Sequence, residues 1–304
     1  MTNPHIPEGP RLRRRLPKLL GLQAFEATAR LGSVSRAAAE LSLTQSAVSR
    51  QLQALEGQLR AQLFLRSKKR LVLTEAGAGY LHDIRSGLAV LGDATEALVS
   101  RQGRGGTLRL ATLPTFGAKW LVPRLPRFYA DHPHVTLDLI TRLAPFDFSM
   151  EQLDGAIHFG GENWSGAITE YLGKEEMIVV GAPSLASQCR APADVVRLPL
   201  LQITSRAFSW HTWLAAVGLS GATVTPYLQV ETFAMGIEAV RAGLCVGILP
   251  SFFVTAEIAA GSLTAIGPSV TSESGYYFVY PERKRDYYPL QAFTRWIREE
   301  ISRQ

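Results

Sequence analysis

With 304 residues the chain is long enough for two or three domains, and its 46% hydrophobic and 19% charged content is typical of a folded globular protein. It has no stretch of about 18 apolar residues without a charge, which argues against a transmembrane helix and favours a cytoplasmic protein. The net charge of +6 is uneven: residues 1–106 hold 16 Lys or Arg against 8 Asp or Glu, as expected for a nucleic-acid-binding segment joined to a second module.

Three short helices are predicted near the start of the chain. The first carries an apolar stripe around Phe25 and ends at Gly32. The second is capped by Ser33 or Ser35 and has small alanine side chains, which let another helix cross closely. Thr44 is a good N-cap for the third helix, so only a short turn separates it from the second.

The third helix has two different sides. Val48, Leu52 and Leu55 form its apolar stripe. Its opposite side exposes side chains that can read base edges in a DNA major groove, namely Gln45, Ser46, Ser49 and Arg50. A solvated helix face fits these residues equally well, and the preceding helix, the tight turn and the basic hairpin that follows favour DNA binding.

A hairpin is predicted from Leu63 to Thr74, with strand-like residues on both sides of a basic tip. The cations of this hairpin are Arg66, Lys68, Lys69 and Arg70. Cations crowded on one small loop repel each other unless they are solvated or face phosphates, so we interpret the hairpin as a phosphate-contacting wing.

A long helix is predicted from Glu75 to about Gln102. Its apolar residues recur in steps of four and three, which indicates pairing with another helix through Leu81, Ile84, Leu88, Leu91 and Leu98. Packing against its own domain is the alternative interpretation. The glycine-rich run at residues 103–106 then ends the helix and reads as a hinge.

From Thr107 onward, short apolar strands alternate with helices, which predicts a mostly parallel α/β module. Its length fits two subdomains with a ligand cleft between them, at about 107–178 with 269–304 and at about 179–268. Pro114 and Thr115 begin a helix whose positive end can hold an anion such as a carboxylate, and Thr232 starts another helix at a strand end. The alternative for each threonine is an ordinary N-cap.

Four segments of the chain resemble the LysR-type transcriptional regulators. The longest, GSVSRAAAELSLTQSAVSRQLQALEGQLRAQLFLRSKKRLVLTEAG, runs from Gly32 to Gly77 and is similar to the DNA-binding signature of this family. LPTFGAKWLVPRLPRF, LDGAIHFG and GIEAVRAGLCVGILP resemble the branch that contains the glycine-cleavage regulator and the β-lactamase activator. His158 stands where many members of the family have arginine.

The resemblance implies a multidomain protein: a basic extension (1–16), an all-α winged helix-turn-helix (17–74), a dimerising linker helix (75–106) and an effector-binding α/β module like a periplasmic binding protein (107–304). It also implies tetramers that act at promoters, with RNA polymerase as a further partner. By position, Gln45, Ser46, Ser49 and Arg50 match the base-reading face and Arg66 a wing contact. Thr115, Thr204, Thr232 and Tyr277 match effector-cleft positions, although Tyr277 also suits a core aromatic.

An enzymatic reading of the second half finds little support. The sequence contains no Gly-x-Ser-x-Gly elbow, no histidines at metal-ligand spacing and no dinucleotide fingerprint, so no cofactor or metal is expected. Cys189 and Cys245 belong to no Cys-x-x-Cys motif and indicate neither a disulfide scaffold nor a zinc site. A DNA-packing protein without effector control is a second alternative, but it would not need an α/β module with a cleft.

Overall fold

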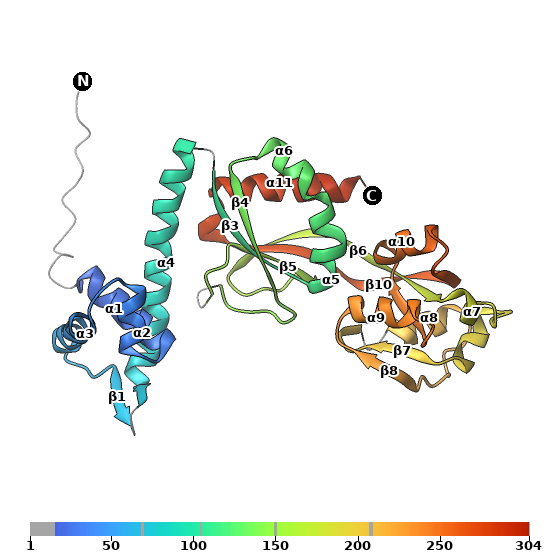
Figure 1. Ribbon diagram of the computed structural model, residues 1–304, viewed down its shortest axis with the longest axis horizontal. Coiled ribbons are helices and arrows are strands. Elements are labelled where there is room, and N and C mark those ends of the chain that lie inside the picture. Colours follow the sequence, from blue (N-terminus) through green and yellow to red (C-terminus); the bar gives the residue numbers. More distant parts are fainter. Residues whose placement is uncertain (1–15, 68–69, 104, 149–150, 207–208, 304) are drawn as a thin grey trace. The chain divides into compact units, whose positions relative to one another are not determined.

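The structure is a computed structural model that describes residues 16–67, 70–103, 105–148, 151–206 and 209–303. The chain divides into two units, Met1–Ala94 and Thr95–Gln304, and each unit has its own hydrophobic core (Figure 1). The basic extension, residues 1–15, lies outside the described residues.

Unit 1 begins with the three predicted helices, α1 (Leu19–Leu31), α2 (Val34–Glu40) and α3 (Gln45–Leu59). Gly32 ends α1 with a φ of 63°, a left-handed conformation that glycine adopts without strain. The hydroxyls of Ser33 and Thr44 accept hydrogen bonds from the first turns of α2 and α3, so both predicted N-caps are confirmed. The apolar stripe of α3 is buried in the core of the unit together with Phe25 of α1.

The wing consists of β1 (Phe64–Ser67) and β2 (Arg70–Leu73), which pair in antiparallel register. Glu56 of α3 fixes the start of the wing, because its carboxylate accepts from the backbone N–H groups of Leu63 and Phe64 at 2.8 and 3.2 Å. A one-residue break follows the wing, and α4 (Glu75–Gly103) begins there.

The first part of α4 packs against its own domain. Leu81 is buried in the core of unit 1, and Ile84 packs against that core. Packing against its own domain, the alternative interpretation, therefore applies to Leu81 and in part to Ile84, and their role in pairing stays a prediction. Leu88 is half-buried and Leu91 is 56% exposed, so an apolar surface begins only after Ile84. The side chain of Leu98 lies outside the described residues.

Unit 2 contains an eight-stranded sheet in the order β4-β3-β5-β10-β6-β9-β7-β8. The strands are β3 (Gly106–Thr112), β4 (Val135–Thr141), β5 (Gly155–Gly160), β6 (Ala167–Gly181), β7 (Leu200–Ile203), β8 (Pro226–Val230), β9 (Val246–Pro250) and β10 (Thr264–Pro281). The prediction of a mostly parallel sheet holds only for its two ends. The pairings of β10 with β5, β10 with β6, and β6 with β9 are antiparallel, because the chain crosses between the subdomains on β6 and returns on β10.

Two α/β subdomains share this sheet, and β6 and β10 run side by side from one to the other (Figure 1). In subdomain I, α5 (Pro114–Phe116) continues through a π-helical turn (Gly117–Leu121) and a 3-10 turn (Val122–Arg124) into α6 (Leu125–Asp131), and α11 (Tyr288–Ser302) closes the chain. Pro123 and Pro126 lie at these irregular turns, where proline interrupts regular α-helical hydrogen bonding. Subdomain II contains α7 (Pro183–Ala186), α8 (Ser209–Ala216), α9 (Phe233–Arg241) and α10 (Ser251–Ala259).

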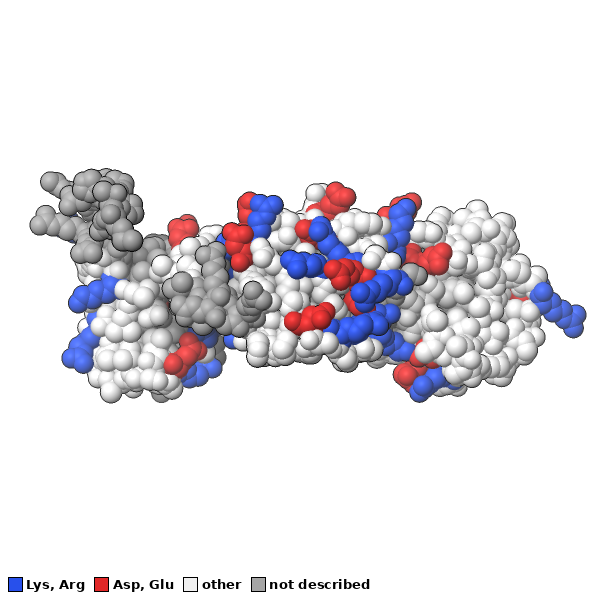
Figure 2. Space-filling view, turned by 90° about the horizontal axis from the view of Figure 1, so that it is seen from above, with Lys and Arg blue, Asp and Glu red and all other residues white. Residues whose placement is uncertain are grey.

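The surface of subdomain I is electrostatically mixed. Figure 2 shows acidic and basic side chains interleaved over the part of unit 2 nearest the middle of the view. Arg127 and Arg303 both pair with Glu300, and Arg298 pairs with Glu170. Within the part of the chain that the structure describes, no helix is long and apolar enough to cross a membrane.

Candidate functional site

The polar face of α3 is accessible to a partner. Gln45, Ser46 and Arg50 are exposed and Ser49 is half-buried, while Val48 on the other side is fully buried. Thr44 precedes this face and holds the first turn in helical geometry, since its hydroxyl accepts from the Ala47 N–H at 3.2 Å. The sequence thus folds into a helix that presents all four predicted base-reading residues near its amino-terminal end.

The wing brings further cations to unit 1. Ser67 pairs with Arg70 and Arg66 with Leu71 across the hairpin. Lys68 and Lys69 lie outside the described residues, as do the side chains of Arg66 and Arg70. Their role in phosphate contact therefore rests on the sequence.

A cavity of about 480 Å³ lies between the two subdomains of unit 2. It is lined by the start of α5, the end of β5, the turn after β7 and the start of α9. Its polar lining consists of Thr115, His158, Thr204, Ser205, Arg206, Glu231, Thr232 and Tyr276, and its apolar lining includes Phe116, Phe159, Phe233 and Phe253. A mostly apolar wall with a few convergent polar groups is typical of a small-molecule site.

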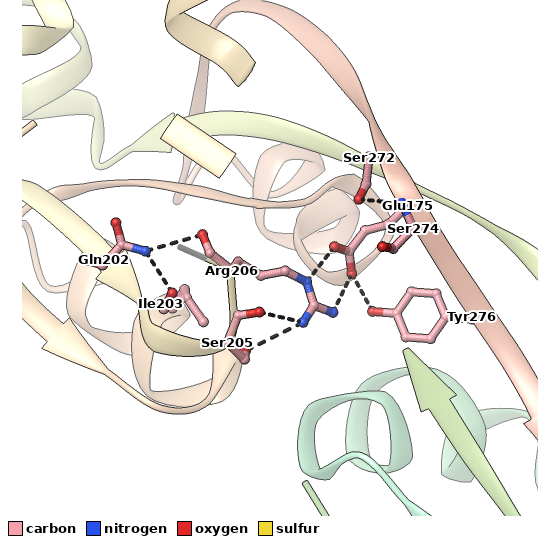
Figure 3. Close-up of polar contacts among 8 residues, drawn as sticks. All are labelled: Glu175, Gln202, Ile203, Ser205, Arg206, Ser272, Ser274 and Tyr276. Atoms are coloured by element: carbon pink, nitrogen blue, oxygen red, sulfur yellow. Dashed lines mark hydrogen bonds and ion pairs between the residues drawn. The ribbon is translucent and has the colours of Figure 1, made fainter. Parts of the chain in front are cut away.

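A buried ion pair forms one wall of the cavity (Figure 3). The Arg206 guanidinium donates to both carboxylate oxygens of Glu175, at 2.8 and 3.1 Å, and the Glu175 side chain is completely buried. The Tyr276 hydroxyl donates to the same carboxylate at 2.5 Å, and burial, followed by the nearby Glu175 charge, raises the pKa of Tyr276 well above its ordinary value. The guanidinium also lies over the Phe159 ring, 3.4 Å from its centre.

Direct hydrogen bonds cross the cleft beside this wall. The Thr115 hydroxyl of subdomain I accepts from the Ala234 N–H of α9 at 2.9 Å. Lys119 donates to the Phe253 carbonyl at 3.1 Å and forms an ion pair with Glu257 of α10. These contacts join the two subdomains directly beside the cavity.

His158 lines the cavity as a neutral side chain. Burial, and to a lesser degree the Arg206 charge, lowers the pKa of its imidazole, so the ring stays uncharged near neutral pH. Trp164 packs edge-on against the ring, with the two ring centres 5.1 Å apart. His158 is thus held in place on the wall of the cavity.

Three of the four predicted effector residues, Thr115, Thr204 and Thr232, line the cavity, and the fourth does not. Tyr277 is 8% exposed and packs with Phe148 and Val279 in a separate cluster. Its neighbour Tyr276 lines the cavity instead, because successive residues of a strand point to opposite faces of the sheet.

The sequence did not predict the ion pair of Arg206 and Glu175 in the cavity wall. Arg206 stands two residues beyond the predicted Thr204, in the turn that follows the buried strand β7, and this position was a usable signal. Glu175 lies between Lys174 and Glu176 on β6, and nothing local singles it out or identifies its partner 31 residues away.

Among the described residues, no group of three or more His, Cys, Asp or Glu side chains is arranged to hold a metal ion. Cys245 is fully buried, and this burial raises the pKa of its thiol to about 11.

Comparisons with known proteins match both units. Residues 19–78 match the family described as "Bacterial regulatory helix-turn-helix protein, lysR family", and residues 101–302 match "LysR substrate binding domain". The chain is 33% identical to the HTH-type transcriptional activator AmpR of Pseudomonas aeruginosa over 98% of this chain and 97% of that one. It is also 33% identical to the glycine cleavage system transcriptional activator of Escherichia coli, over 93% and 94% of the two chains. The solved effector domain of the Pseudomonas aeruginosa AmpR covers 64% of this chain and 95% of its own, with a TM-score of 0.59 and 29% identity.

Proposed function

Because the chain belongs to the LysR family of bacterial transcriptional regulators, we propose that it reads promoter DNA with the exposed face of α3 and senses a small molecule in the cavity of unit 2. It is a transcriptional regulator with a helix-turn-helix DNA-binding domain and an effector-binding domain, not an enzyme. The observation that carries the proposal is the two-sided α3, whose buried stripe leaves Gln45, Ser46 and Arg50 free for base edges.

In the proposed complex, α3 enters the major groove and the wing follows the phosphate backbone. Arg50 would donate to base acceptors, while Gln45, Ser46 and Ser49 both donate and accept. The wing cations, Arg66, Lys68, Lys69 and Arg70, would contribute affinity for any DNA sequence through counterion release.

The proposed regulator acts as an oligomer. The half-buried Leu88 and the exposed Leu91 lie on α4 beyond Ile84. Together with Leu98 they would pair with the same helix of a second copy. Two such pairs would make the tetramer that the family resemblance implies, and contact with RNA polymerase at the promoter would follow. Paired reading helices require half-sites about one helical turn, or a multiple of it, apart.

Effector binding would act on the hydrogen bonds that cross the cleft. A ligand among Thr115, Thr204 and Thr232 would change the relative stability of open and closed subdomain arrangements. The positive ends of the helices that begin near Thr115 and Thr232 favour a carboxylate-bearing effector. The ion pair of Arg206 with Glu175 opposes one, because it already neutralises the guanidinium.

The test is capture of genomic DNA fragments by the full-length protein at physiological salt, followed by sequencing. We expect enrichment of a few promoter regions with paired half-sites. Arg50→Ala should cost about 1–3 kcal/mol on the captured sites and little on random DNA, as is typical of a base-reading side chain. Lys68→Ala should weaken binding to both equally and lower the salt slope by about one unit.

Two results would count against the proposal. Equal losses on specific and random DNA for Arg50→Ala would remove this residue from the reading face. Capture of no fragments, both with and without added metabolite extract, would contradict the regulator itself.

A further inference from the structure

The cation in the cavity of unit 2 is already neutralised. Glu175 accepts two hydrogen bonds from Arg206 through its two carboxylate oxygens, and the backbone and side-chain oxygens of Ser205 accept from Nη1 at 3.2 and 3.5 Å. Only 11% of the Arg206 side chain is exposed. An anionic ligand would have to compete with this bidentate pair, which has little remaining hydrogen-bonding capacity.

The other ionisable groups of the lining do not favour an anion. Glu231 is exposed, and it has no ion-pair partner among the residues that the structure describes. His158 is neutral near pH 7 for the reasons given above. With Arg206 balanced by Glu175, the cavity has a net negative charge because of Glu231.

The starts of α5 and α9 are the remaining sources of positive potential, and two of the first N–H groups of α9 are already bonded. The Ala234 N–H donates to Thr115, and the Met235 N–H donates to Thr232 at 3.4 Å. The carboxylate of Glu231 stands in the chain directly before Thr232 and opposes the positive end of the helix dipole. Hydroxyl oxygens of Thr115 and Thr232 therefore already satisfy two N–H groups that an anion would otherwise use.

We infer that the effector is an uncharged or amine-bearing molecule rather than an organic anion, with an amine beside Glu231 and a hydroxyl or amide near Thr204 and Ser205. This inference rests on the proposed function of the cavity as an effector site. An effector of this kind differs from the carboxylate-bearing effector that the helix starts alone suggest. The aromatic wall formed by Phe159 and Phe233 would hold the apolar part of such a molecule.

The experiment compares ligands that differ only in charge on the full-length protein. The probes are phenylacetate, phenylacetamide and 2-phenylethylamine, with hexanoate, hexanamide and hexylamine as an aliphatic set. Saturation-transfer NMR titrations give a Kd for each. In the wild type we expect the amide and the amine to bind at least about tenfold more tightly than the acid of the same set. A tenfold difference in Kd corresponds to about one hydrogen bond to a charged group.

Three variants separate the charges. Glu231→Gln should weaken the amine about tenfold and leave the amide unchanged. Glu175→Gln frees Arg206 and should reverse the order in favour of the acid. Glu238→Gln is the matched control, because Glu238 lies on the same α9, pairs with Arg241 at 2.7 Å and does not line the cavity. It should leave all binding unchanged.

The outcomes distinguish this inference from the proposed function. An acid that binds the wild type as tightly as its amide would overturn the inference alone. An amine whose Kd does not change in Glu231→Gln would also overturn the inference. Glu231 is exposed, so this variant gives a result even if Glu175→Gln does not fold. Absence of binding by all six probes to the wild type and every variant would overturn the effector cavity itself.

Discussion

Replacing Thr115 by valine should destabilise unit 2 by breaking one hydrogen bond across the cleft. Thr115 is 3% exposed and its hydroxyl accepts from the Ala234 N–H at 2.9 Å. Valine has nearly the same shape but no acceptor, so the N–H loses its partner at a partly buried position. The loss should be about 1–2 kcal/mol. For a unit of this size, each kcal/mol lowers the Tm by about 2–4 °C, which gives about 2–8 °C for Thr115→Val.

Tryptophan fluorescence measures this effect in the full-length protein. All 5 tryptophans of the chain lie beyond residue 107, so the thermal transition seen by fluorescence reports unit 2 alone. Thr255→Val is the matched control: this exposed hydroxyl donates to the Ser251 carbonyl at 3.0 Å within α10, and its loss should cost under about 0.5 kcal/mol. An unchanged Tm for Thr115→Val, or an equal loss in the control, would refute the reasoning.

Further predictions concern both units. Gly77→Ala should destabilise unit 1 in urea melts followed by circular dichroism, since the added Cβ would lie 2.2 Å from the Leu63 carbonyl oxygen. Gly79→Ala has open space and should stabilise α4 by up to about 1 kcal/mol; the same sign for both variants would contradict this packing. Leu91→Glu should shift sedimentation equilibrium toward smaller species, and an unchanged mass would argue against pairing through α4. Burial, aided by a neighbouring guanidinium, lowers the pKa of His158, so the folded state binds this proton less readily than the unfolded chain. Stability should therefore fall as the pH drops below about 6.5, and His158→Gln should reduce that fall in fluorescence-monitored melts.

The DNA-binding unit could be predicted closely because its signals are local. The caps Ser33 and Thr44, the buried stripe with Val48 and the polar face with Arg50 all lie within a few residues of the structures they specify. The heptad spacing was less decisive. An apolar stripe on a long helix does not tell whether it meets its own domain or another chain, and Leu81 meets its own domain.

The cavity could be predicted only in part, because its walls come from distant segments. Thr115 and Thr232 were found from helix-start chemistry, which is local. Local sequence does not tell whether Tyr276 or Tyr277 lines the cavity, because both are aromatic. The pairing of β10 with β6 also shifts its register between these two residues. The pairing of Arg206 with Glu175 depends on the order of the sheet, in which only β9 separates β6 from β7. The periodicity of the sequence does not predict this order.

The crossing of β6 and β10 also determines the order in which the protein can be completed during synthesis. Gly181 pairs with Thr264, so residues 182–263 form an excursion whose ends meet inside the sheet. Subdomain I lacks its central strand β10 and its covering helix α11 until the last part of the chain has been made. Unit 1 has no such dependence, because its contacts end by Ala94. At about 5–20 residues per second, a ribosome takes about 10–40 s to make the rest of the chain. For that interval a DNA-binding unit exists without its sensor, and a chain truncated before β10 would remain permanently in this unregulated condition.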